Sequence, residues 1–142
     1  PGQMRFVVEK LLQFGATRDK IMLTERGTQF GYSDLIFDVR SIPKMKKLDV
    51  PVVLDVTHSL QLPNQEKGVA GGEPGLIASM AAAGVAAGVD GIFVETHPRP
   101  QEALSDGSNM LPLDRMDDMI RRIVAFRQTY VKLNKEIQET AQ

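Results

Sequence analysis

The sequence predicts an α/β protein built around a parallel sheet. Three short apolar runs alternate with four segments of helical periodicity, which is the alternation of a parallel sheet with right-handed crossovers. The three runs are apolar on both faces, as expected for strands that are covered on both sides. Their starts recur about every 30 to 40 residues, the length of one βα unit.

The first half of the chain contains two expected helices and one strand. Apolar residues recur at three- and four-residue spacing from Met4 to Phe14, which predicts a helix with one buried face that ends at Gly15. Residues 21–23 (IML) follow as a buried strand with a polar tip. We expect a second helix over residues 34–48, which Pro43 must kink or interrupt.

The second half continues the alternation with two strands and two helices. The expected order is a strand over residues 52–56, a helix over 76–88, a strand over 91–94 and an amphipathic helix over 112–135. Residues 59–75 are rich in glycine and proline, so we expect no regular element there. A connection of this length is more often a functional lid than a simple linker.

Composition excludes several classes of function. With 142 residues, 42% hydrophobic and 25% charged, the chain should form one packed domain. A formal net charge of -1 argues against a nucleic-acid or membrane-surface binder. The chain has no cysteine, which excludes disulfides and fits a reducing compartment. Because no apolar run approaches the roughly 20 residues of a membrane span and no signal-peptide pattern is present, we expect a soluble, cytoplasmic protein.

Ionisable side chains follow each predicted strand. Glu25 and Arg26 come after the first strand, His58 after the second, and Glu95 and His97 after the third. The carboxyl edge of a parallel sheet is where barrels and open α/β sheets bind ligands, so the pattern predicts an active-site rim. Neighbouring strands lie about 4.8 Å apart, which would bring these tips within several ångströms of one another. Singly, Arg26 could be an ion-paired arginine, Glu95 a cap and His58 a structural histidine.

Two of these residues, together with Asp106 from the next loop, form a candidate metal site. His58, Glu95 and Asp106 offer an imidazole and two carboxylates, which are suitable ligands for Mn, Fe or Zn. Without cysteine, such a site would need a further nitrogen or oxygen ligand, water, or residues from elsewhere. A scattered acidic loop residue explains Asp106 equally well. Gly71 and Gly72 could admit an anion to backbone N–H groups, but two glycines are a weak phosphate signal and fit a hinge better.

Four motifs give the sequence a family resemblance. They are residues 23–28 (LTERGT) followed by 30–32 (FGY), 55–59 (DVTHS) with Gln61 and Pro63, 95–98 (ETHP), and 103–107 (ALSDG). In this order and spacing the set resembles 3-deoxy-D-manno-octulosonate 8-phosphate synthase (KDO-8-phosphate synthase), a transferase of lipopolysaccharide biosynthesis. The resemblance covers essentially the whole chain.

The resemblance implies an activity, partners and roles for the polar residues. The family condenses phosphoenolpyruvate with D-arabinose 5-phosphate and water in a (β/α)8 TIM barrel, usually as a homotetramer. Arg26 would bind an anionic group of phosphoenolpyruvate. His58, Glu95 and Asp106 would be catalytic, and would ligate a divalent metal (Mn, Fe, Zn or similar) in metal-dependent members; metal-independent members need none. Gln61, Gly71 and Gly72 would belong to the lid over the sugar phosphate.

Two departures from the family limit these expectations. The chain resembles only about the last three βα units of the barrel, so residues 1–142 are expected to be the C-terminal portion of one TIM-barrel domain. Three strands cannot close a barrel that needs about eight. The first strand, whose cysteine or asparagine distinguishes the metal classes, falls outside the resemblance. In addition, Ala70 replaces a serine or threonine that many relatives place before the two glycines.

Two other functions remain open at this stage. The sister enzyme, 3-deoxy-D-arabino-heptulosonate 7-phosphate synthase of the aromatic amino-acid pathway, shares the phosphoenolpyruvate chemistry and a similar ligand set. The motif at residues 30–32 and the long loop after His58 favour the KDO enzyme. Alternatively, the chain alone is a non-catalytic partial barrel that packs or assembles, with exposed strand edges and helix faces.

Overall fold

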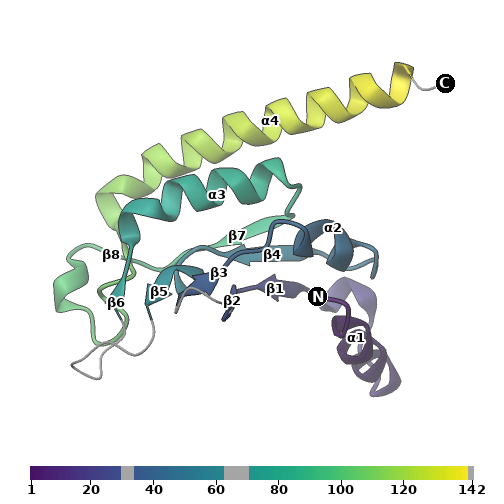
Figure 1. Cartoon of the computed structure of the whole chain (residues 1–142), viewed down its shortest axis with the longest axis horizontal. Coiled ribbons are helices and arrows are strands. Elements are labelled where there is room, and N and C mark those ends of the chain that lie inside the picture. The colour runs from purple at the N-terminus through teal and green to yellow at the C-terminus, as the bar shows by residue number, and fades with distance from the viewer. Residues whose placement is uncertain (30–33, 63–70, 141–142) are drawn as a thin grey trace.

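A computed structural model describes residues 1–29, 34–62 and 71–140 of the chain (Figure 1). Its centre is a parallel sheet in which β4 (Val52–Asp55) lies between β1 (Leu23–Glu25) and β7 (Gly91–Phe93). The predicted parallel sheet is therefore confirmed. The carboxyl ends of all three strands point to one edge, and the described residues form an open sheet rather than a closed barrel.

Two long helices cover one face of this sheet. Helix α3 (Ile77–Ala86) packs on the sheet, and α4 (Met116–Thr140) lies along α3 and extends past it (Figure 1). Gly84 permits the approach of α3 to β4, because a Cβ at this position would overlap the side chain of Leu54. Both helices were predicted, although α4 runs five residues beyond Lys135.

The N-terminal helix agrees with the sequence prediction, and the segment after β1 differs from it. Helix α1 (Met4–Gln13) ends next to Gly15, whose φ of 93° suits glycine. The first strand was predicted over residues 21–23 but begins at Leu23. The predicted helix over 34–48 is confirmed only for α2 (Ser41–Lys46) and is wrong before it, where β3 (Leu35–Ile36) pairs with β2 (Thr28–Gln29).

Pro43 lies in the first turn of α2, where a helix tolerates proline. It is the third residue of the helix, where the missing N–H would have had no partner within the helix. The loop prediction for residues 59–75 was also wrong at its ends, because β5 (Gln61–Leu62) and β6 (Gly71–Gly72) form an antiparallel pair. The rest of that loop, residues 63–70, and the motif at 30–32 lie outside the described residues.

The core is centred on β4. Sixteen apolar residues of the described ranges are buried, including Val52 and Leu54 of β4 and Met119 of α4. Other apolar side chains are exposed, among them Leu104, Phe14 and Met22. The outer strands β1 and β7 each pair only with β4 in the described part of the chain. Among the described helices, none is both long enough and apolar enough to cross a membrane.

Candidate functional site

The carboxyl edge of the sheet brings three of the predicted residues together. His58 begins a 3-10 turn after β4, Glu95 follows β7, and Asp106 lies in the loop before β9 (Leu111–Pro112). One ligand atom from each side chain lies within 4.8 Å of those from the other two. Nε2 of His58 is 3.6 Å from Oε1 of Glu95. The polar residues that follow neighbouring strands therefore lie close together, as the strand order predicted.

A buried carboxylate orients the His58 ring. Oδ2 of Asp55 lies 2.7 Å from Nδ1 of His58, and Oδ1 of Asp55 accepts the backbone N–H groups of Thr57 and His58 at 3.0 and 2.9 Å. The ring also stacks on Phe93, with centroids 5.9 Å apart. These contacts turn Nε2 toward Glu95. The sequence analysis did not single out Asp55, although an acidic residue ending an apolar strand three residues before His58 was a usable signal.

Glu95 is held through its backbone. Its N–H donates to Oγ1 of Thr57 at 2.7 Å, and its carbonyl accepts the N–H of Leu111 at 3.0 Å. Thr57 is fully buried, so the point where β7 leaves the sheet is fixed by the end of β4. The chain then continues into β8 (Thr96–His97), which pairs with β9. His97 lies outside the three-residue cluster, with Nδ1 next to the backbone of Arg99.

Asp106 lies at a tight turn that only certain residues accept. Its φ is 52°, a left-handed conformation that aspartate tolerates better than most residues. A Cβ at the next residue, Gly107, would overlap the carbonyl of Pro100. Oδ1 of Asp106 accepts a hydrogen bond from Nε2 of Gln61 at 2.7 Å. The turn and this hydrogen bond together direct the carboxylate toward His58 and Glu95.

Gln61 also contacts the arginine at the tip of β1. Nη2 of Arg26 donates to Oε1 of Gln61 across a long 3.4 Å contact, and Arg26 is otherwise exposed at the rim. Glu25 does not join the cluster, because its Oε1 accepts the N–H of Gly27, whose φ is 83°. Gln61 thus connects Arg26 to Asp106 across the site.

The second glycine of β6 has a steric explanation. Gly72 does not have a positive φ, and a Cβ there would overlap Oδ1 of Asn109. The Asn109 side chain is buried and finds no hydrogen-bond partner among the described residues. Close packing of Gly72 on Asn109 therefore accounts for this position better than a hinge. Ala70 and Pro63 lie outside the described residues.

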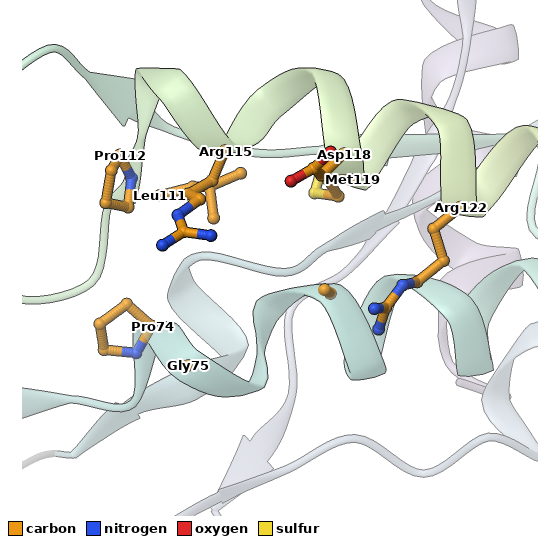
Figure 2. A pocket seen from close by; sticks show the side chains of 9 residues that line it. Pro74, Gly75, Leu111, Pro112, Arg115, Asp118, Met119 and Arg122 are labelled. Carbon is orange, nitrogen blue, oxygen red and sulfur yellow. The ribbon is translucent and has the colours of Figure 1, made fainter.

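Two neighbouring cavities lie at this end of the molecule. One, of about 600 Å³, opens beside Asp106 and is lined by residues 103–108. The other, of about 470 Å³, lies between α3 and α4, where Arg122 extends from α4 and Arg115 from the 3-10 turn just before it (Figure 2). None of the predicted site residues lines this second cavity. The first cavity is lined by one member of the cluster, Asp106.

The cluster has the donor set of a divalent-metal site. One imidazole nitrogen and two carboxylate oxygens converge from three separate segments, and each is fixed by a neighbouring hydrogen bond. Such nitrogen and oxygen ligands suit Mn, Fe or Zn. The three side chains are neither fully buried nor fully exposed, so a ligand entering from the rim could reach them. The residues present therefore fit a metal, with open positions for other ligands.

The fold and the cluster define an α/β protein with a candidate ligand site at the carboxyl edge of a parallel sheet, the edge where such folds bind ligands. The sequence model of the DAHP synthetase I family matches residues 1–131, and the chain belongs to that family. Curated relatives are named 2-dehydro-3-deoxyphosphooctonate aldolase, another name for KDO-8-phosphate synthase, so the resemblance found in the sequence is confirmed.

Relatives from three organisms match most of this chain. The protein of Nitratidesulfovibrio vulgaris strain DP4 is 51% identical over 125 residues, covering 88% of this chain and 45% of the relative. That of Dechloromonas aromatica is 44% identical over 125 residues, with the same coverage. That of Legionella pneumophila strain Corby is 43% identical over 136 residues, covering 96% and 49%. The chain thus spans about half the length of the curated relatives it matches.

Proposed function

We propose that this chain is the C-terminal part of a KDO-8-phosphate synthase. The complete protein would condense phosphoenolpyruvate with D-arabinose 5-phosphate and water, giving 3-deoxy-D-manno-octulosonate 8-phosphate and inorganic phosphate. The convergence of His58, Glu95 and Asp106 at the carboxyl edge of a parallel sheet carries the proposal. The identity of 51% to a relative named for this product class supports it.

The proposed roles follow the chemistry of each side chain. Arg26 would bind an anionic group of phosphoenolpyruvate, because its guanidinium is exposed at the rim and makes only a long contact with Gln61. Gln61, Gly71 and Gly72 would lie near the sugar phosphate, where β5 and β6 border the loop over residues 63–70. His58 would contact phosphoenolpyruvate directly.

His58, Glu95 and Asp106 would hold a divalent metal if the complete protein is metal-dependent. When bound, such an ion supplies a Lewis acid that polarises an oxygen of the substrate. In a metal-independent protein the same three residues would position substrate. Their separation of less than 4.8 Å suits either role.

We propose a partial (β/α)8 barrel that supplies about its last three βα units. Within the described ranges, β1 and β7 pair with no strand on their outer edges, and apolar residues on α1, including Phe6 and Leu11, are exposed. An open apolar surface of this kind favours association with more protein. The remaining units of the barrel would cover it, and the complete protein would assemble as a homotetramer, as is usual in the family.

The choice of aldehyde substrate tests this function. The name of the matching family favours the sister activity as a second candidate, with erythrose 4-phosphate in place of arabinose 5-phosphate. Purified complete protein should be supplied with phosphoenolpyruvate and each aldose phosphate, and phosphate release measured. We expect a strong preference for arabinose 5-phosphate. A preference for erythrose 4-phosphate would contradict the proposal and support the heptulosonate synthase.

A further inference from the structure

We propose that Asp55 is a positioning residue that fixes the tautomer of His58, so that Nε2 presents its lone pair to Glu95 and Asp106. The inference rests on the proposed role of His58 in the site, and it concerns a residue that lies outside the three-residue cluster. Three contacts of one carboxylate carry it: one with the His58 ring and two with backbone N–H groups.

The three hydrogen bonds of the Asp55 carboxylate show which partner donates in each of them. An ionised carboxylate only accepts hydrogen bonds. Oδ1 already accepts the N–H groups of Thr57 and His58, and Oδ2 faces Nδ1 of His58 at 2.7 Å. Nδ1 must therefore carry the proton. In a neutral imidazole the other nitrogen, Nε2, then has the free lone pair.

The surroundings keep this arrangement rigid. The Asp55 side chain is only 7% exposed and ends a strand that is paired on both sides. Thr57 is fully buried, and Phe93 stacks on the imidazole at an interplanar angle of 30°. Because the Asp55 carboxylate only accepts hydrogen bonds and is fixed in place, the His58 ring can bind it in one orientation only. Carboxylate partners of this kind orient histidines in metal sites generally.

The two oxygens of Asp55 have separable tasks, which makes the proposal testable. Oδ1 caps the turn, whereas Oδ2 acts only on the imidazole. In Asp55→Asn the amide oxygen must keep accepting the two backbone N–H groups, because an amide NH₂ there would face two donors. The NH₂ then points at Nδ1, which must become an acceptor, and the proton moves to Nε2. The turn survives while the tautomer reverses.

Nitrogen NMR reads the tautomer directly. The complete protein should be labelled with ¹⁵N-histidine and measured without metal at an alkaline pH where the ring is neutral, with His58 assigned by the signal lost in His58→Gln. We expect the proton on Nδ1 in the wild type and on Nε2 in Asp55→Asn. A wild-type proton on Nε2, or an unchanged tautomer in the variant, would overturn the proposal. If the variant fails to fold, the wild-type spectrum decides alone.

A matched variant separates positioning from general destabilisation. Asp90 also accepts a backbone N–H of β4, from Val52, but at the opposite end of the strand. Asp90→Asn should leave the His58 tautomer unchanged; a reversal there would overturn the proposal. In a protein that binds Mn²⁺, Asp55→Asn should weaken Mn²⁺ affinity about 10- to 100-fold, and Asp90→Asn should not. Failure to form the proposed product would contradict the proposed function without affecting the tautomer result.

Discussion

Gln61 donates its Nε2–H to Oδ1 of Asp106 at 2.7 Å, and its own Oε1 accepts from Arg26 on the other side of the site. One amide therefore couples a candidate ligand to the candidate anion-binding group. Both hydrogen bonds involve a charged group, and the one to the carboxylate is the stronger because it is much shorter than the 3.4 Å contact with Arg26.

Replacing Gln61 by methionine should lower activity while preserving the fold. Methionine is close in size but offers no donor to Asp106, and a hydrogen bond to a charged group contributes about 1.5–3 kcal/mol. We expect kcat/KM of the complete protein to fall by about tenfold or more. The control is Gln128→Met on the exposed surface of α4. Equal activity of the two variants would show that Gln61 does not position Asp106.

Gly72→Ala should destabilise the protein. The added methyl group would overlap the buried Asn109 side chain, which must move. Overpacking of this kind typically costs about 1–3 kcal/mol. Urea denaturation should show this loss, whereas Gly75→Ala should change stability little, since a Cβ there meets nothing within 4 Å. If the two variants unfold at the same urea concentration, the contact with Asn109 does not constrain Gly72.

Asp90 should stabilise the protein in a pH-dependent way. Burial raises the pKa of Asp90, but hydrogen bonds from Lys46 and the Val52 N–H, with the charge of Lys46, outweigh this effect and hold the pKa below its ordinary 3.8. Since the pKa is lower in the folded state, the stabilisation is complete above about pH 4 and is lost as the pH falls through the folded-state pKa.

Asp90→Asn should therefore lower the unfolding free energy by about 1 kcal/mol at pH 7, which is below the usual range of about 1.5–3 kcal/mol for charged hydrogen bonds because the pair is partly exposed. Denaturation curves at pH 7 and pH 3 measure the difference from wild type, which should shrink at pH 3. Asp117→Asn is the control, because its ion pair with Arg121 is exposed and should contribute little at either pH. If wild type and Asp90→Asn differ in unfolding free energy by the same amount at pH 3 as at pH 7, the pKa of Asp90 is not the cause of the difference.

Metal removal should reveal the role of the three-residue cluster. If His58, Glu95 and Asp106 are ligands, a chelator should abolish the activity of the complete protein and Mn²⁺ should restore it. Glu95→Gln should then weaken Mn²⁺ binding, because a neutral amide oxygen is a poorer ligand than a carboxylate. Activity that persists in chelator would make the protein metal-independent and leave the three residues as substrate-positioning groups.

The sequence was sufficient to predict the parallel sheet and the convergence of its tips. Apolar runs such as residues 52–56 carry a strong signal, and the carboxyl ends of parallel strands must share an edge. The sequence was not sufficient to predict the structure of residues 34–48, because their pattern of apolar and polar residues fits a helix as well as a strand followed by a short helix. There, pairing of β3 with β2 overrides local propensity, and only six residues remain helical.

The contacts that hold the site in place could not be read from residue patterns. Asp55 looks like the polar end of a strand, and its importance depends on the turn that brings His58 back beside it. Likewise, two adjacent glycines suggested a hinge, whereas the need for Gly72 comes from Asn109, a residue distant in sequence. The roles of Asp55 and Gly72 therefore become visible only when the structure shows which residues they contact.

Formation of the eight-carbon product is the most direct test of the central claim that this chain is part of a KDO-8-phosphate synthase. Mass spectrometry should compare the complete protein and the 142-residue chain alone, each with phosphoenolpyruvate and D-arabinose 5-phosphate. We predict 3-deoxy-D-manno-octulosonate 8-phosphate from the complete protein and none from the chain alone, because three strands cannot close the barrel. Product from the isolated chain, or its absence with the complete protein, would contradict the account.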